Sequence, residues 1–294
     1  MTFISCTDVV RVYRMGEIEI PALRGLSLEV DRGEMVSIMG PSGSGKTTLL
    51  NILGGLDRAT AGTIKVDDVS LGFTPASELV NYRRRVVGHI FQNLNLIPTL
   101  TALENVELPM IFNETKRNAR KNRAEELLQV VDLGDRLHHK PGELSGGQQQ
   151  RVAIAAALAN DPPILLADEP TGELDSETSR MIVDHLLHIN SEYGKTIIMV
   201  THNPIVAAAT RRILRIEDGI IMGTYTPAQM GANAGVVNYV DQLQARIAKL
   251  KQELVDLDTQ IQKGSIKGDV YVKERLRLTA SIEGLEDEIH RHGG

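Results

Sequence analysis

The stretch GPSGSGKTT, residues 40–48, combines glycines, a lysine and two threonines in the pattern Gly40-x4-Gly45-Lys46-Thr47. Because glycine has no side chain, such a loop lets several backbone N–H groups converge on one phosphate group. The Lys46 ammonium would add a positive charge, and the Thr47 hydroxyl would be a ligand for Mg²⁺. A glycine-rich turn with an incidental lysine has the same composition, so the neighbouring elements must decide between the two interpretations.

The segments on either side of this loop favour phosphate binding. GEMVSIMG, residues 33–40, is a short apolar run that ends in glycine and predicts a strand, and a helix is predicted from about Gly45. Strand, loop and helix in this order are the context that a phosphate-binding loop requires. The sequence therefore predicts a nucleotide site, with residues 40–48 as the phosphate loop.

A second set of polar residues follows another apolar run, ILLADE, residues 164–169. The apolar residues predict a buried strand, and Asp168 and Glu169 stand at its carboxyl end, where open α/β sheets bind their ligands. Asp168 would hold the shell of a magnesium ion, and Glu169 would polarise an attacking water as a general base. Acidic pairs also cap strand ends without any catalytic role, but after a phosphate loop the catalytic interpretation is favoured.

The segment LSGGQ, residues 144–148, begins another predicted helix and offers a second phosphate cradle. Free backbone N–H groups and the positive end of the helix dipole both favour anions there. Ser145 as an ordinary helix cap also describes the local sequence. That alternative does not explain Gly146 and Gly147, since glycine lowers helix propensity by about 1 kcal/mol per residue.

The remaining periodicities predict the elements that position these residues. Residues 163–169 and 195–202 are apolar on both faces and predict buried parallel strands, whereas the first thirty residues alternate as antiparallel strands do. A hairpin is predicted at Asp218-Gly219, and the pattern between residues 99 and 160 is helical. The expected fold is an α/β core with a helical insert.

Six motifs now occur in the order found in ABC-type ATPase subunits, which the chain resembles over roughly residues 1–225. They are the phosphate loop, Gln92 after VVGHIF, LSGGQ, ILLADE, TGELD (171–175) and His202 after IIMV. FQNLNLIPTLTALENVELPM and ADEPTGELD are most similar to the branch that serves lipoprotein release and macrolide export. The resemblance implies a P-loop NTPase core with an antiparallel β subdomain and an α-helical subdomain at about residues 93–160, within an ATPase domain at 1–228.

The resemblance also assigns roles to individual residues. Gln92 would contact Mg²⁺ and the attacking water, His202 the γ-phosphate, and Asp175 would communicate across a dimer. Tyr13 stands where the family has an aromatic residue that stacks on adenine, although an ordinary strand tyrosine is the alternative. The residues so assigned to ATP are Tyr13, Gly40, Pro41, Ser42, Gly43, Ser44, Gly45, Lys46, Thr47, Thr48, Ser145, Gly146, Gly147, Gln148 and Asp175; those assigned to catalysis are Glu169, His202 and Gln92, and those assigned to the metal are Thr47, Gln92 and Asp168.

In this family, the LSGGQ loop closes over the γ-phosphate held by the phosphate loop of a second copy, so that two chains enclose two ATP molecules. That arrangement would explain why one chain carries two incomplete cradles. The resemblance also implies an integral membrane permease subunit on a separate chain. Leu94, Leu96 and Ile97 would either line the groove for a cytoplasmic helix of that subunit or belong to the core of the helical insert.

Two functions remain open for such a subunit. The first is ATP-driven export or envelope transport of a lipoprotein, peptide or drug-like substrate. The second is signalling through a membrane partner to cell-wall enzymes, as the cell-division members of the superfamily do. The chain has only one ATPase unit, unlike translation factors, and lacks the long coiled-coil insertion of chromosome-maintenance ATPases.

Bulk properties restrict the partners further. The 294 residues carry a net charge of −6 without a block of five like charges, which disfavours nucleic acid as a partner. The single cysteine, Cys6, excludes an internal disulfide and fits a reducing compartment. No run reaches the roughly 18 apolar residues of a membrane span, so we expect no direct membrane insertion. The expected location is cytoplasmic, peripheral on the inner face of the membrane through the permease.

Residues 236–294 lie outside the resemblance. Leu243, Ile247, Leu250, Leu254, Leu257 and Ile261 follow a heptad spacing, and the spacing resumes at Tyr271, Leu278, Ile282, Leu285 and Ile289. Folding the chain back near Ile266, between Gly264 and Gly268, brings the two stripes into register, with Leu257 alone facing a polar residue, Arg275. The segment therefore predicts an antiparallel coiled-coil hairpin that acts as an interaction or regulatory arm.

Overall fold

The computed structural model describes residues 1–16, 18–72, 74–172 and 174–229, and individual residues between 247 and 282. The chain divides into two compact units, Met1–Pro227 and Ala228–Gly294. No helix among the described residues is both long and apolar enough to cross a membrane.

A mostly parallel sheet forms the centre of the first unit, in the order β10-β9-β3-β8-β7-β6. Its strands are β3 (Met35–Met39), β6 (Val87–Ile90), β7 (Ile164–Asp168), β8 (Thr196–Thr201), β9 (Arg212–Glu217) and β10 (Ile220–Tyr225). Only β10 runs antiparallel to its neighbour, after a turn at Asp218-Gly219 in which both residues have positive φ. β3, β7 and β8 are almost entirely buried because helices and the second sheet cover them. The predicted strands of this sheet and the predicted β-hairpin at Asp218-Gly219 are confirmed.

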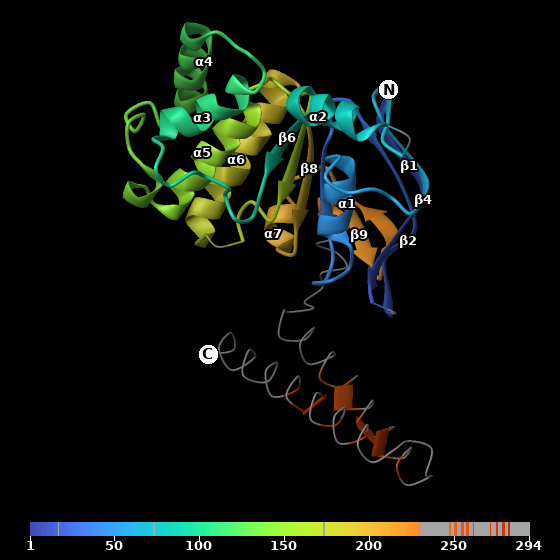
Figure 1. Cartoon of the computed structure of the whole chain (residues 1–294). Coiled ribbons are helices and arrows are strands. Elements are labelled where there is room, and N and C mark those ends of the chain that lie inside the picture. The colour runs from blue at the N-terminus through green and yellow to red at the C-terminus, as the bar shows by residue number, and fades with distance from the viewer. Residues whose placement is uncertain are drawn as a thin grey trace. The chain divides into compact units, whose positions relative to one another are not determined.

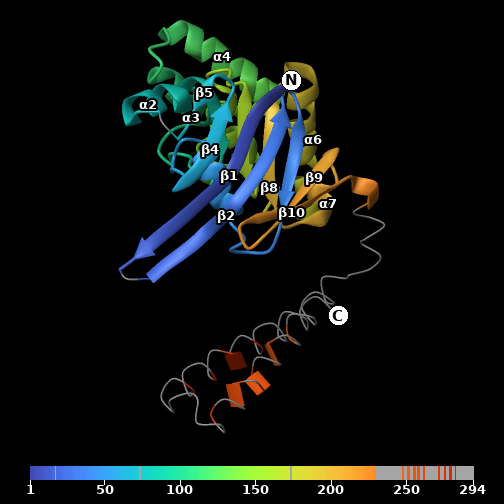
Figure 2. The same ribbon diagram turned by 90° about the vertical axis from the view of Figure 1, so that its right-hand side faces the viewer.

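An antiparallel sheet stands beside it, in the order β2-β1-β4-β5. Long β1 (Thr2–Met15) and β2 (Ile18–Asp31) pair along their length, and β4 (Ala61–Val66) lies on the other side of β1, followed by the short β5 (Val69–Ser70). Figure 2 shows β1, β2 and β4 side by side at one face of the unit. This sheet is the predicted antiparallel subdomain.

Helices cover the parallel sheet and build the predicted insert between β6 and β7. The insert contains α3 (Ala102–Ile111), α4 (Arg117–Val130), a single 3₁₀ turn (Pro141–Glu143) and α5 (Gly146–Leu158), which gather at the end of the unit away from β1 and β2 (Figure 1). The other helices are α1 (Lys46–Leu53), α2 (Ala76–Arg85), α6 (Ser176–Tyr193) and the short α7 (Pro204–Ala207). Thr101 and Glu104 form a reciprocal capping box that fixes the start of α3.

Two hydrophobic clusters hold these layers together. One joins the antiparallel sheet, α1 and one face of the parallel sheet, while the other joins α3, α4, α5 and α6 to the opposite face. Strand β7 contributes to both clusters, with Leu166 in the first and Leu165 in the second. The carboxyl end of β7 is therefore packed on both faces, and this fixes the backbone that carries Asp168 and Glu169.

In the second unit, the described residues are isolated helical positions. Ile247, Leu257, Leu278 and Ile282 are buried there, and the Tyr271 hydroxyl donates to Asp258 Oδ1 at 2.7 Å. Leu243, Leu285 and Ile289 of the predicted heptad stripes, and the predicted fold point near Ile266, lie outside the described residues.

Candidate nucleotide site

The phosphate loop connects β3 to α1, as predicted. Gly43 and Gly45 have φ of 78° and 99°, a left-handed conformation that a residue with a side chain would adopt only under strain. A Cβ on Gly40 would stand 2.1 Å from the Ile216 carbonyl oxygen, so the close approach of β9 also demands glycine there. The loop between these glycines exposes Pro41 and Ser42 to solvent.

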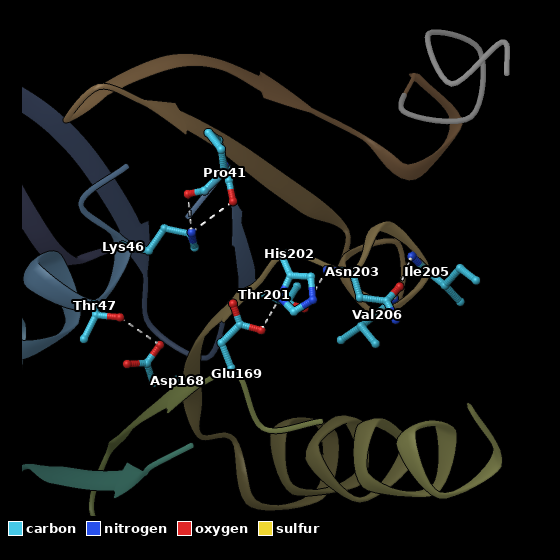
Figure 3. Close-up of polar contacts among 11 residues, drawn as sticks. Pro41, Lys46, Thr47, Asp168, Glu169, Thr201, His202, Asn203, Ile205 and Val206 are labelled. Atoms are coloured by element: carbon cyan, nitrogen blue, oxygen red, sulfur yellow. Dashed lines mark hydrogen bonds and ion pairs between the residues drawn. The ribbon is translucent and has the colours of Figure 1, made fainter. Parts of the chain in front are cut away.

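Lys46 occupies the centre of this loop. Its ammonium donates to the carbonyl oxygens of Gly40 at 2.9 Å and Pro41 at 2.7 Å (Figure 3), and the residue is only 6% exposed. Burial lowers the pKa of Lys46, whereas the negative charges of Glu169 and Asp168 act in the opposite direction. The lysine is thus a desolvated cation held inside the loop by backbone oxygens.

Thr47, at the start of α1, meets the carboxyl end of β7. Its hydroxyl donates to Asp168 Oδ1 at 3.3 Å, although the two residues are 121 positions apart (Figure 3). Burial raises the pKa of Asp168 and the charge of Glu169 adds to this, while the hydrogen bond from Thr47 opposes it. A hydroxyl and a carboxylate side by side are the oxygen ligands that Mg²⁺ prefers.

Glu169 takes an unusual backbone conformation directly after β7. Its φ is 48°, and its N–H donates to the Val200 carbonyl of β8 at 3.0 Å. A non-glycine residue in this region costs on the order of 1 kcal/mol, which functional sites often tolerate. Its Oε2 lies 2.6 Å from Nδ1 of His202, the residue that follows β8 (Figure 3). This hydrogen bond raises the pKa of His202 against the opposing effect of burial.

Two cavities flank Glu169. One of about 80 Å³ is lined by Gln92, Leu94, Gly146, Gln150, Glu169, Pro170, Gly172 and Leu174. The other, of about 110 Å³, is lined by Glu169, Thr171, Gly172, Leu174, Ser176, Ser179, Thr201, His202 and Asn203. The structure therefore places Gln92 in one cavity with Glu169 and His202 in the other, although both residues are far from Glu169 in the sequence.

The predicted second cradle begins α5 as a well-formed helix cap. Ser145 Oγ accepts from the Gln148 N–H, and the Gln148 side chain accepts from the Ser145 N–H in return. A Cβ on Gly147 would stand 2.2 Å from Thr178 Cγ2, so packing against α6 requires that glycine. Gly146 has no such constraint, because its nearest neighbour would be Leu174 Cδ2 at 3.4 Å. The interpretation of this segment as an ordinary helix start thus explains Ser145 and Gly147, but it gives no reason for a glycine at position 146.

Asp175 caps α6 beside this cradle. Its carboxylate accepts from the N–H groups of Glu177 and Thr178 and from the Thr178 hydroxyl. These bonds, led by the one from the Thr178 N–H, lower the pKa of Asp175. Thr178 therefore touches both Asp175 and the space beside Gly147.

Tyr13 lies half-buried on β1 in a cluster that the sequence did not predict. Its hydroxyl donates to Asp57 Oδ2 at 2.7 Å, and the Arg11 guanidinium stands 4.4 Å from its ring centroid. Arg11 in turn pairs with Asp57 Oδ1 at 2.8 Å. No local pattern marks Asp57, because the pairing of Thr60 and β4 with β1 is what brings it to Tyr13.

Of the apolar residues after Gln92, Leu96 packs against the cluster that contains the helical insert, Leu94 lines the smaller cavity, and Ile97 is exposed. Leu96 therefore belongs to the core of the helical insert, as one of the two alternatives predicts, and the groove for a membrane subunit stays a prediction for the exposed Ile97.

Known proteins are similar to this chain in sequence. The chain matches the model of the ABC transporter family over residues 23–172. An uncharacterized ABC transporter ATP-binding protein of Thermotoga maritima is 53% identical over 216 residues, which are 74% of this chain and 92% of that protein. A macrolide export ATP-binding/permease protein, MacB of Syntrophobacter fumaroxidans, is 49% identical over 224 residues, 75% of this chain but 31% of that protein.

A solved structure is similar in fold as well as in sequence. It is the dimeric ATP-binding cassette MJ0796, of Methanocaldococcus jannaschii, in a post-hydrolysis state bound to ADP and Pi. Its sequence is 47% identical, the alignment covers 76% of this chain and 98% of that one, and the TM-score is 0.71. The covered share corresponds to the size of the first unit, Met1–Pro227.

Proposed function

The chain belongs to the ABC transporter family and is an ATPase of that family, and we propose that it binds Mg·ATP at the phosphate loop and hydrolyses it with Glu169 as general base. The observation that carries the proposal is the meeting of three charged residues from two elements: Lys46 in the phosphate loop, and Asp168 and Glu169 at the carboxyl end of β7. A buried lysine needs an anion to replace lost hydration, and a triphosphate supplies it.

The residues present fit a magnesium ion. Asp168 and Thr47 offer a carboxylate and a hydroxyl within 3.3 Å of each other, and Mg²⁺ commonly takes one or two protein oxygens with the rest from phosphates and water. Because burial raises the pKa of Asp168, a cation beside it would relieve the cost of its charge. Gln92 would add an amide oxygen. When bound, the ion would neutralise the charge of the phosphate oxygens.

The residues of the chain have distinct tasks in this proposal. Glu169 accepts a proton from the attacking water, since its Oε2 is held by His202 and the residue lines both cavities. His202 keeps the carboxylate oriented and presents its other ring nitrogen to the γ-phosphate. Gln92, which lines the smaller cavity with Glu169, positions the water.

We further propose that two copies enclose two ATP molecules, with Ser145, Gly146 and the start of α5 of one copy over the phosphate loop of the other. The freedom of Gly146 from any packing requirement supports this, because a side chain there would obstruct only an incoming group. The dimeric cassette structures of the relative give the same support. Asp175, which caps α6 next to this cradle, would sense closure.

The ATPase would drive a conformational change in an integral membrane subunit on a separate chain, for export or envelope transport. The relatives named macrolide export ATP-binding/permease proteins, in which a permease is part of the same chain, support a membrane partner. Exposed Ile97 would contribute to the surface for that partner. Signalling to cell-wall enzymes is the second candidate, and purification of the membrane partner with its cargo distinguishes the two.

For the second unit we propose the antiparallel helical hairpin, within residues 236–294, as an arm outside the ATP site. Its support is local: the Tyr271 hydroxyl donates to Asp258, and Arg275 lies 3.8 Å from the same carboxylate. Ile247, Leu257, Leu278 and Ile282, from both predicted stripes, are buried. Polar contacts and burial between segments on either side of residues 262–270 are what a hairpin would produce.

The test of the proposed function is nucleotide binding by the Lys46→Ala variant. The wild type should bind a fluorescent ATP analogue and release phosphate from ATP with Mg²⁺, whereas Lys46→Ala should do neither. Unchanged affinity in the variant would contradict the phosphate-loop assignment.

A further inference from the structure

The cluster of Arg11, Tyr13 and Asp57 joins two segments that no motif connects. Arg11 and Tyr13 are two residues apart on β1 and therefore point to the same face of the strand. Asp57 lies after α1, in the segment that leads into β4. The Thr60 N–H donates to the Val10 carbonyl at 2.7 Å, and the Val12 N–H donates to Thr60 Oγ1 at 3.0 Å, so that this segment continues the pairing of β4 with β1.

The Asp57 carboxylate is fully engaged. Oδ1 accepts from Arg11 at 2.8 Å and from the Arg58 N–H at 2.7 Å, and Oδ2 accepts from the Tyr13 hydroxyl at 2.7 Å. The carboxylate therefore fixes both ends of the cluster, the hydroxyl of Tyr13 and the guanidinium that covers one face of its ring. Arg11 Nε is buried without a hydrogen-bond partner in the described part of the chain, which leaves the ion pair and the ring to hold this side chain.

This cluster stands next to the phosphate loop. A Cβ on Gly45 would lie 2.5 Å from the Ala22 carbonyl oxygen and 2.9 Å from Leu23 Cδ2, so β2 touches the loop directly. Leu23 is the register partner of Arg11. Because neighbouring strands are about 5 Å apart, Arg11 is one strand away from the residues that contact the loop.

We infer that Asp57 is a positioning residue for the nucleobase: it fixes Tyr13 by its hydroxyl and Arg11 over one face of the ring, and leaves the other face for adenine. The inference rests on the proposed binding of ATP at the phosphate loop and on Tyr13 as the residue that stacks on adenine. A ring held at both its hydroxyl and one face loses little freedom when a base stacks on it, which strengthens the stacking. Asp57 itself does not touch the nucleotide.

The experiment compares two ligands on the full-length protein by titration calorimetry. A non-hydrolysable ATP analogue needs both the phosphate loop and the base site, whereas inorganic tripolyphosphate needs only the loop. Tyr13→Ala should lower the affinity for the analogue roughly tenfold or more, since base–aromatic stacking contributes that much. Tyr13→Phe should weaken binding of the analogue about fivefold, the effect of one hydrogen bond. Asp57→Ala, which also releases Arg11, should weaken it at least as much, and the double variant should bind no more weakly than Asp57→Ala alone. Tripolyphosphate should bind all of them as it binds the wild type.

The same sheet offers a matched control. The Arg32 guanidinium stands 4.2 Å from the Phe3 ring and pairs with Asp67 at 2.8 Å, near the other end of β1. Arg32→Ala removes an equivalent cation over an aromatic ring and should leave the binding of both ligands unchanged.

Each outcome decides one step. If the wild type binds neither ligand, the proposed function is wrong. If Tyr13→Ala binds the analogue normally, the base site is elsewhere and the inference fails with it. Two results would overturn the inference alone. In the first, Tyr13→Ala binds the analogue weakly but Asp57→Ala and Tyr13→Phe bind it as the wild type does. In the second, Asp57→Ala lowers the affinity for both ligands equally. In either case, Asp57 does not position the base. Should Asp57→Ala not fold, Tyr13→Phe, which keeps the Arg11–Asp57 pair, decides alone.

Discussion

Glu169 and His202, 33 residues apart, meet at 2.6 Å across the ends of two neighbouring parallel strands. The contact follows from the sheet order, since β7 and β8 are adjacent and each residue directly follows its strand. It gives the carboxylate a fixed direction, and it links the electrostatic state of His202 to that of the proposed general base.

This contact predicts a pH-dependent stability. Because Glu169 raises the pKa of His202 in the folded chain, the pair stabilises the fold below the ordinary histidine pKa, and this contribution is lost as pH rises through the raised value. The substitution His202→Gln should therefore lower the free energy of unfolding in urea, relative to the wild type, by more at pH 6 than at pH 9. The His202 side chain is 64% exposed, so solvent screens the effect and we expect it to be small.

His185 provides the control for that measurement. Burial lowers its pKa, so its contribution to stability is present above the ordinary histidine pKa and is lost as pH falls through the lowered value. His185→Gln should show the opposite pH dependence. An equal loss at both pH values for His202→Gln would mean that the contact with Glu169 does not shift its protonation.

The two glycines of the LSGGQ segment should separate folding from function. Gly147→Ala places a methyl group against Thr178 and should lower the free energy of unfolding by about 1–3 kcal/mol, as overpacking does. The added methyl group of Gly146→Ala would make only an ordinary contact, with Leu174 Cδ2 at 3.4 Å, so this variant should unfold at the same or higher urea concentration. It should nevertheless lose ATP-dependent dimerisation. Urea unfolding and light scattering of both variants measure this. A Gly146→Ala protein that dimerises normally would contradict the role of this glycine in the closed dimer.

Much of this arrangement could be predicted from the sequence, because the decisive interactions are local. The phosphate loop needs only its own glycines and the strand and helix that flank it, and Asp168 and Glu169 stand at the end of a strand that its apolar residues mark. Asp57 could not be predicted, since its partner Tyr13 is 44 residues away and reaches it only through the register of the antiparallel sheet. The packing of Gly147 on Thr178 and the left-handed conformation of Glu169 likewise depend on tertiary contacts.

The hairpin predicts a cross-link within one chain. Leu250 and Ile282 face each other in the proposed register, and Cys6 is the single native thiol to remove first. Leu250→Cys with Ile282→Cys should therefore give an intramolecular disulfide on oxidation. Intermolecular products that predominate at low protein concentration would favour a dimerisation segment. Deletion of residues 236–294 should leave nucleotide binding intact in either case.

The central claim is that two copies close over two ATP molecules and that Glu169 then hydrolyses them. Glu169→Gln should lower turnover by roughly 10²–10⁴-fold, the contribution of a general base, while ATP binding is kept. Gel filtration of this variant tests the claim most directly: it should elute as a monomer without nucleotide and as a dimer with ATP, and Lys46→Ala in the same background should abolish the shift. A Glu169→Gln protein that has the same mass with and without ATP would contradict the account.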